Sequence, residues 1–175
     1  MKKQKQLKRG AAMGRANVEK SMIFMYGEYM NSTNMKFRCS DALCSGMAKL
    51  SGFRFIINSR GVAAIVPDAG SEVQGVLWRV TPFDETSVDK TLGYNADEPE
   101  KSRCSKAVYT VHTSVGMPVE AVVYSEKDTT PGEPAQSYMQ KVISGAAEHA
   151  VEKKYIDEVL RLYKPKIKRE TFTTY

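Results

Sequence analysis

The residues with the clearest chemical potential stand where an apolar segment meets a glycine, at residues 26–29, Tyr-Gly-Glu-Tyr. The apolar run at 23–26 predicts a strand that ends there. Glycine lets the chain turn and lets a ligand approach the backbone closely, so the loop can present N–H groups to an anion or a carbonyl oxygen. Glu28 adds a carboxylate at the mouth of this loop. We expect that carboxylate either to act as an acid or base or to fill the anion site itself.

The cysteines and histidines point away from a metal site and from a disulfide framework. The three cysteines, Cys39, Cys44 and Cys104, show no C-x-x-C spacing, which argues against zinc and against paired disulfides. His112 and His149 are the two histidines, and neither has the spacing of a metal ligand. We therefore expect no metal and reduced thiols, with His149 as a surface cation at a helix end.

Composition indicates one domain with a basic tail. The chain has 175 residues, of which 42% are hydrophobic, and a net charge of +6. The first 20 residues hold seven basic residues and one acidic residue, whereas the remainder is balanced at 19 of each. Such a tail is typically flexible, and its charge also suits contact with nucleic acid, anionic lipid or a protein partner. We assign a basic N-terminal tail to 1–20, the domain to 21–163 and a basic C-terminal tail to 164–175.

No segment resembles a membrane span or a secretory signal. No run approaches the ~20 apolar residues that a span requires, and the first residues are too polar and too basic for a signal peptide. We expect a cytoplasmic protein, with a mitochondrial leader as the alternative because acids are absent before Glu19.

Residue periodicity predicts strands that are joined mostly by short turns, with helices placed singly or at the end. Strands are expected at 23–26, 52–58, 62–66, 73–80, 107–113 and 119–124, and helices at 82–92, 134–149 and 152–163. Thr81, Pro82 and Gly93 supply the cap, first position and stop of the first helix. Segment 40–50 stays open between a short helix and an irregular crossing. The fold class is α+β, a small, mixed, mostly antiparallel β-barrel with helices packed outside.

Five motifs follow one another between residues 23 and 160. They are FMYGEYM at 24–30, FIIN at 55–58 with GVAAIVP at 61–67, GSEVQGVLWRVT at 70–81, VDKTLG at 88–93, and a scattered set at 122–124, 138, 145–146 and 155–156. In this order they resemble the gamma-glutamylcyclotransferase-like superfamily. The third motif is the most specific of the five.

The resemblance implies a barrel with a cavity in which a γ-glutamyl amide is cleaved by its own α-amine. The products are 5-oxoproline and a free amine or amino acid, and no metal or cofactor is required. A glutamate in an Asp-x-x-Glu-Gly pattern moves the proton, while backbone N–H groups of the loop stabilise the oxyanion or hold the substrate carboxylate. The implied substrate-binding residues are Tyr26, Gly27, Glu28, Tyr29, Tyr124 and Tyr138.

The chain departs from this pattern inside the expected pocket. The Asp-x-x-Glu-Gly pattern reads DKTLG at 89–93, so the usual acid/base position is Leu92. Loss of such a group costs about 10²–10⁴ in rate. In the loop, Glu28 and Tyr29 replace the serine and asparagine of the family. Glu28 is the candidate substitute base, acting from the opposite wall of the cavity.

Two functions follow from these departures. The first is a cyclotransferase whose substrate is a γ-glutamyl amine or amino acid, with Glu28 as its base. The alternative is a non-catalytic protein that uses the barrel as a binding scaffold and the basic tails to contact a protein, a nucleic acid or a ribonucleoprotein. Leu92 is the residue on which the choice depends, because leucine transfers no proton.

Overall fold

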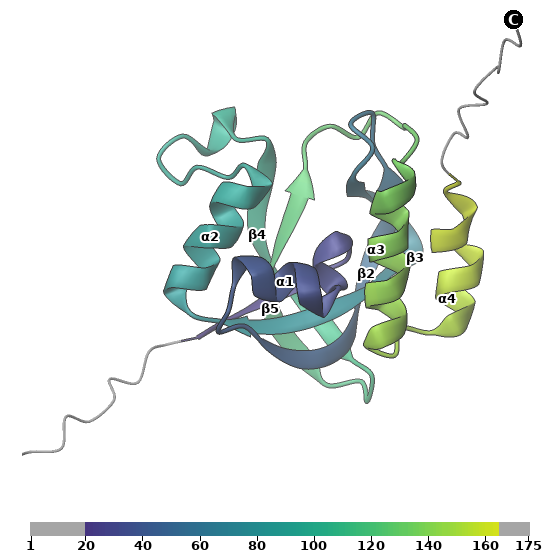
Figure 1. Ribbon diagram of the computed structural model, residues 1–175, viewed down its shortest axis with the longest axis horizontal. Coiled ribbons are helices and arrows are strands. Elements are labelled where there is room, and N and C mark those ends of the chain that lie inside the picture. The colour runs from purple at the N-terminus through teal and green to yellow at the C-terminus, as the bar shows by residue number, and fades with distance from the viewer. Residues whose placement is uncertain (1–19, 165–175) are drawn as a thin grey trace, which may run out of the picture.

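The computed structural model describes residues 20–164, except the side chain of Gln136. Five strands form a closed barrel in the order β1-β3-β2-β4-β5 (Figure 1). Their bounds are Ser21–Met25 for β1, Leu43–Ile57 for β2, Ala63–Val80 for β3, Cys104–Thr113 for β4 and Pro118–Glu126 for β5. β1 closes the barrel by pairing with β5 in parallel, and every other pairing is antiparallel. The predicted mixed, mostly antiparallel barrel is confirmed.

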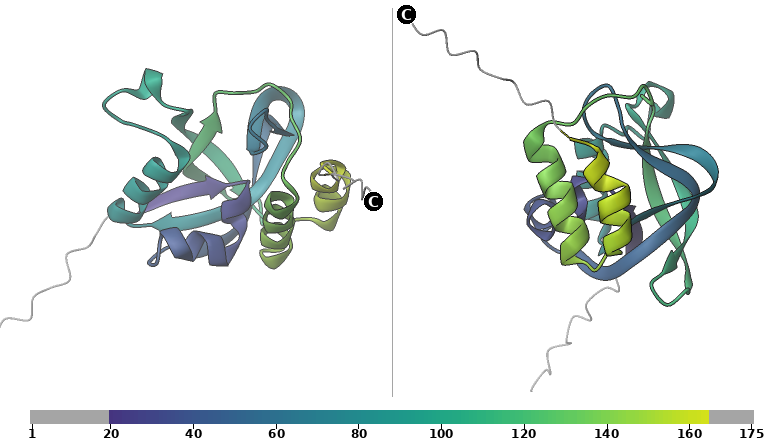
Figure 2. Two further views of the ribbon diagram at one scale, coloured as in Figure 1. Left: turned by 45° about the horizontal axis from the view of Figure 1, so that its top comes forward. Right: turned by 90° about the vertical axis from the view of Figure 1, so that its right-hand side faces the viewer.

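Helices cover the outside of this barrel. The α-helices are α1 (Ser32–Arg38), α2 (Pro82–Leu92), α3 (Gln136–Glu148) and α4 (Lys153–Glu158), and the 3₁₀ helices are η1 (Glu28–Met30), η2 (Pro99–Lys101) and η3 (Leu160–Leu162). Helices α3 and α4 lie side by side, whereas α2 lies on the other side of α1 (Figures 1 and 2). Within residues 20–164, no helix is long and apolar enough to cross a membrane.

The core fills the barrel and continues beneath the helices. Phe24, Phe55 and Trp78 are at most 2% exposed, and burying each such side chain contributes roughly 2–3 kcal/mol relative to leaving it in water. Gly75 on β3 has no room for a side chain, because a Cβ would meet the carbonyl oxygen of Met25 at 2.4 Å. The missing side chain lets β1 pack closely against β3, which sets the end of β1 where the candidate loop begins.

Local sequence chemistry explains α2. The side-chain oxygen of Thr81 accepts a hydrogen bond from the Asp84 N–H at 3.1 Å, and the Asp84 carboxylate accepts one from the Thr81 N–H at 3.4 Å. This reciprocal pair is a capping box, which starts the helix. Gly93 ends it in the left-handed conformation, with φ of 78°, which glycine adopts at little cost. The bounds of this helix are as predicted.

Two sheet predictions need correction. The segment at 43–50 is the first half of β2, and the turn predicted at 67–70 lies inside the continuous strand β3. Strands β2 and β3 pair along most of their lengths. The register shifts between Ser51 and Phe53, which pair with Glu72 and Pro67, so residues 68–71 of β3 bulge out of the pairing. The glycine and proline signals therefore mark a bulged, edge-like stretch of a long hairpin instead of a chain reversal.

The helices outside the barrel also differ from expectation. The short helix α1 was not predicted, and Asn31 caps it by accepting a hydrogen bond from the Asn34 N–H at 3.1 Å. The final predicted helix divides into α4 and η3 at Val159. The proposed tails lie outside the described residues apart from Lys20 and Lys164, so their boundaries stay predictions.

Candidate functional site

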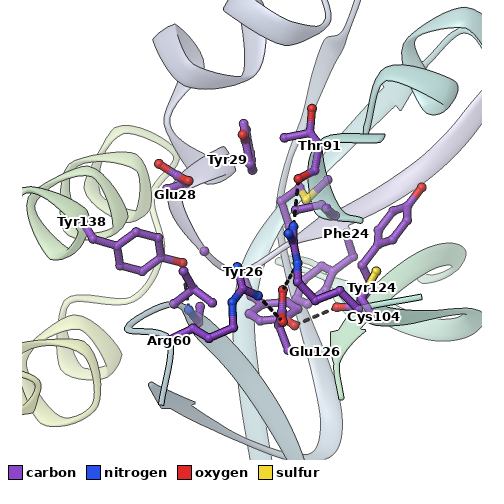
Figure 3. A pocket seen from close by; sticks show the side chains of 16 residues that line it. Phe24, Tyr26, Glu28, Tyr29, Arg60, Thr91, Cys104, Tyr124, Glu126 and Tyr138 are labelled. Atoms are coloured by element: carbon purple, nitrogen blue, oxygen red, sulfur yellow. Dashed lines mark hydrogen bonds and ion pairs between the residues drawn. The ribbon is translucent and has the colours of Figure 1, made fainter. Parts of the chain in front are cut away.

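A cavity of about 170 Å³ opens beside the loop that follows β1 (Figure 3). Its walls come from the ends of β1, β5 and α2, from the turn between β2 and β3, and from α3. The residues expected to bind substrate all line it, and so does the expected acid/base position: Tyr26, Gly27, Glu28, Tyr29, Tyr124, Tyr138 and Leu92. Residues that are far apart in the sequence thus share one cavity.

Gly27 and Tyr138 hold the loop against α3. The Tyr138 hydroxyl accepts a hydrogen bond from the Ala63 N–H at 2.8 Å. A Cβ on Gly27 would meet the same hydroxyl at 2.9 Å and the Ala63 Cβ at 3.2 Å, so glycine makes room for the phenol. Burial raises the pKa of Tyr138. The phenol therefore stays neutral, and a neutral phenol that accepts one hydrogen bond still has a proton to donate.

The hydroxyls of Tyr26 and Tyr124 are engaged within the wall. Tyr26 donates to the Tyr124 carbonyl oxygen at 2.7 Å, and Tyr124 donates to the Asp89 carboxylate at 2.5 Å. Burial raises the pKa of both phenols. Asp89 also accepts from the Lys106 ammonium at 2.9 and 3.0 Å. These two tyrosines therefore present their rings to the cavity and use their hydroxyls to hold β1, β5 and α2 together.

Glu28 lies on the side of the cavity nearest α3 (Figure 3). Its carboxylate is 3.6 Å from the Lys141 ammonium, and its side chain is 28% exposed. Glu28 thus lines the cavity from a partly solvated position and has a lysine partner at the rim. Its role as a substitute base stays a prediction.

Leu92 gives the end of α2 a hydrocarbon surface at the cavity. A cation covers the backbone on either side of it. The Arg103 guanidinium donates to the Thr91 carbonyl oxygen at 3.0 Å, and a Cβ on Gly93 would meet the Arg103 Cζ at 3.0 Å. The glycine after Leu92 therefore provides the space in which Arg103 crosses the end of the helix.

Sequence reasoning missed a second carboxylate, Glu126 at the end of β5. Its side chain is 10% exposed and lines the cavity. The Arg60 guanidinium approaches one carboxylate oxygen at 2.8 Å, and the Arg103 guanidinium approaches the other at 3.7 Å (Figure 3). The sequence SEKD at 125–128 resembles a solvated turn, and its one signal was an acid placed two residues after Tyr124.

The cavity thus combines two carboxylates, Glu28 and Glu126, with two guanidiniums and a phenolic donor, Tyr138. Guanidiniums bind carboxylates, and a carboxylate binds an ammonium group. The arrangement is chemically suited to a zwitterion whose ammonium and carboxylate groups are attached to the same carbon atom. Within the described part of the chain, no group of three or more His, Cys, Asp or Glu side chains is arranged to hold a metal ion.

Comparison with models of known protein families shows to which family the chain belongs. The family model described as "Gamma-glutamyl cyclotransferase, AIG2-like" matches residues 23–142. The chain belongs to this family. The match begins in β1 and ends in α3, so it includes every element that lines the cavity. A comparison with curated protein sequences found no match.

Solved structures share the fold of this gamma-glutamyl cyclotransferase family member. One is a structure described as gamma-glutamyl cyclotransferase, with a TM-score of 0.76 at 22% identity over 90% of this chain and 93% of that one. Another, an uncharacterised protein from Homo sapiens, gives 0.75 at 22% identity over 85% and 90%. YkqA from Bacillus subtilis gives 0.68 at 19% identity over 85% of this chain and 56% of that one. At these identities the likeness concerns the fold, and the chemistry must be argued from the cavity.

Proposed function

We propose that the cavity binds the α-amino-acid end of a γ-glutamyl amide and cyclises it to 5-oxoproline, releasing the amine. Glu126 takes the role that Leu92 cannot perform. One observation supports this most directly: the Glu126 carboxylate lies in the cavity beside Arg103, whose guanidinium also reaches the backbone next to Leu92. The Arg103 guanidinium therefore contacts both the Glu126 carboxylate and the backbone beside position 92, the usual place of the acid/base.

The charges of the cavity match those of the γ-glutamyl head group. Its α-carboxylate pairs with Arg60 or Arg103, and its α-ammonium pairs with Glu126. Charge-assisted hydrogen bonds of this kind are roughly twice as strong as neutral ones. Because the carboxylate and the guanidiniums lie next to one another, they favour a ligand with an ammonium and a carboxylate on one carbon over a simple amine or a simple acid.

The reaction then follows from a single proton carrier. Glu126 accepts a proton from the α-ammonium, and the freed amine attacks the γ-carbonyl carbon to form the five-membered ring. Tyr138 donates a hydrogen bond to the oxygen that gains negative charge. When the C–N bond to the leaving group breaks, protonated Glu126 gives its proton to the departing amine. The ring nitrogen then loses its second proton to the same amine, which leaves as an ammonium ion. The products are 5-oxoproline and the amine.

Product formation tests this assignment. We would incubate the protein with a panel of γ-glutamyl amines and γ-glutamyl amino acids and measure 5-oxoproline by mass spectrometry. Glu126→Gln should lower kcat by about 10²–10⁴, whereas Glu28→Gln should change it only a few-fold. Glu120→Gln, on the exposed part of the same strand, is the matched control. A reversed order of the Glu28 and Glu126 variants would move the base to Glu28.

A second candidate function is ligand binding without turnover, which Leu92 favours. Here the wild-type protein binds γ-glutamyl compounds but releases no 5-oxoproline from any member of the panel. Leu92→Glu restores a carboxylate at the family position and, under this hypothesis, creates turnover where the wild type has none. If the wild type is active and Leu92→Glu adds nothing, the non-catalytic hypothesis fails.

In this second candidate function, the basic tail at residues 1–20, with its seven basic residues, binds the protein to its partner. A chain lacking residues 1–20 should lose its co-purifying partners, and partner binding by the full chain should weaken steeply with rising salt if the partner is a nucleic acid. Partner binding that survives the deletion would remove the tail from the proposal.

A further inference from the structure

A thiol and an imidazole meet outside the cavity, at the start of β2 and the end of α3. The Cys44 Sγ lies 3.3 Å from the His149 Nδ1. Cys44 is exposed, whereas the His149 side chain is only 12% exposed. His149 was expected at the surface as a helix-end cation, but its ring instead packs beneath an accessible thiol.

The backbone after Cys44 is shaped around its sulfur. A register shift separates Cys44 from Gly46 in the pairing of β2 with β3, and Gly46 adopts a positive φ of 96°. The Gly46 N–H thereby donates a hydrogen bond to the Cys44 Sγ at 3.4 Å. Bulges of this kind re-aim side chains, and this one points the Gly46 N–H at the Cys44 sulfur.

The other side of the imidazole ring is held in place. The His149 Nε2 lies 3.0 Å from the Ser32 Oγ and 3.8 Å from the Glu148 carboxylate. The Trp78 indole packs edge-on against the ring, with centroids 5.4 Å apart, and its buried N–H has no hydrogen-bond partner among the described residues. A nucleophile beside a base that a third group orients is the arrangement that activates a thiol.

The other two cysteines provide a contrast within the same chain. Cys39 and Cys104 are 0% and 1% exposed, and burial raises the pKa of each thiol to about 11. Neither is accessible as a nucleophile. Of the three cysteines, Cys44 alone combines access to solvent with contact to a histidine.

We propose that Cys44 and His149 form a site of thiol–disulfide exchange with small disulfides. His149 accepts the Cys44 proton, and the thiolate attacks one sulfur of the disulfide. The S–S bond of the small molecule breaks as the new S–S bond to Cys44 forms, and the leaving thiolate takes the proton from His149. Cys44 is oxidised to a mixed disulfide while half of the small molecule is reduced to a thiol, so no further oxidant is needed.

The surroundings favour exchange over catalysis on a bound substrate. Cys44 lines neither the cavity beside the β1 loop, nor the pocket between β3 and α4, nor the one between α1 and α2. Disulfide exchange needs only in-line access to the sulfur and a leaving thiol. A second thiol from solution reverses the reaction, so the modification is reversible.

The test uses the reduced full-length protein and 2-hydroxyethyl disulfide, a neutral probe without a γ-glutamyl group. Intact mass and peptide mapping follow the adduct. We expect one adduct per chain, on Cys44, forming about tenfold faster than in His149→Gln, because the imidazole accepts the thiol proton as the sulfur attacks. His112→Gln, which alters the other histidine, should match the wild type, and Cys44→Ser should form no adduct.

A comparison of the native and the unfolded wild-type protein tests the proposal without depending on whether a variant folds. In guanidinium chloride the wild-type chain loses the contact with His149, so its three cysteines should react at similar rates, and Cys44 should react more slowly than in the native protein. Native Cys44 reacting no faster than unfolded Cys44 would overturn the proposal. So would an adduct on Cys39 or Cys104 in the native protein, or a folded His149→Gln variant that reacts at the wild-type rate.

Discussion

The Arg60 guanidinium lies 2.8 Å from the Glu126 carboxylate, although 66 residues separate them. Arg60 belongs to the turn between β2 and β3, and Glu126 ends β5. Their ion pair joins the β2–β3 turn to the end of β5 at the wall of the cavity. Its geometry both fixes the carboxylate and leaves guanidinium donors facing the same space, because an arginine side chain carries five N–H groups.

Arg60 is predicted to bind the carboxylate of the ligand. Arg60→Met should weaken the binding of γ-glutamyl ligands by about ten- to a hundredfold, since a hydrogen bond to a charged group contributes roughly 1.5–3 kcal/mol. Calorimetric titration measures the dissociation constant. Arg54→Met removes an exposed arginine that pairs with Asp68 outside the cavity and should leave affinity unchanged. Equal effects of the two substitutions would count against a specific carboxylate site.

Glu85 is predicted to make stability depend on pH in the acid range. Burial acts to raise its pKa, but hydrogen bonds from Lys106 and Ser21 outweigh burial and hold the pKa below its ordinary value of 4.5. A carboxyl whose pKa is lowered by folding stabilises the protein above about pH 4.5, and this contribution disappears as pH falls through the folded value.

The measurement is Tm between pH 7 and pH 3 for the wild type and Glu85→Gln. The variant should be less stable by about 1 kcal/mol near neutral pH, and the two curves should converge towards pH 3. Asp41→Asn, an exposed acid, is the control and should run parallel to the wild type. Curves for Glu85→Gln and the wild type that stay parallel throughout would refute the assignment.

Ala150 is predicted to be replaceable by glycine with a gain in stability. It follows α3 with a positive φ of 58°, a conformation that costs a residue with a Cβ roughly 1–2 kcal/mol. The structure keeps α3 and α4 separate, with the Val151 N–H donating to the Ala146 carbonyl oxygen at 3.0 Å.

Ala150→Gly should therefore raise the free energy of unfolding by about 1 kcal/mol, or Tm by roughly 2–4 °C for a domain of this size. Ala147→Gly, in the last turn of the same helix, should have the opposite sign, at about 1 kcal/mol of destabilisation. Chemical denaturation of both variants measures the difference. A loss of stability in both would show that position 150 is not strained.

Several secondary-structure elements could be predicted from the sequence because they depend on interactions between nearby residues. The cap at Thr81 and the stop at Gly93 define α2 through hydrogen bonds and dihedral angles within a few residues, and its bounds agree with prediction. The hairpin of β4 and β5 was likewise predicted, although both strands extend further at the ends away from the turn. The order of motifs also identified the family correctly and placed Leu92 in the cavity.

Long-range pairing decided the rest. The stretch at 67–70 looks like a turn by itself, and residues 68–71 indeed lack partners on β2. Pairing on both sides of this bulge, of Pro67 with Phe53 and of Glu72 with Ser51, carries β3 through it without reversing the chain. Glu126 looks like part of a solvated turn until Arg60 and Arg103 converge on it. His149 looks like a surface cation until the curve of β2 brings Cys44 to its ring.

The sequence by itself therefore determined the fold class, the family and the absence of a carboxylate at position 92, because each depends on residue type and order. Only the tertiary structure decided which charges share the cavity and which thiol meets an imidazole. Those relationships depend on barrel closure, which brings together side chains from strands and turns that no local pattern connects.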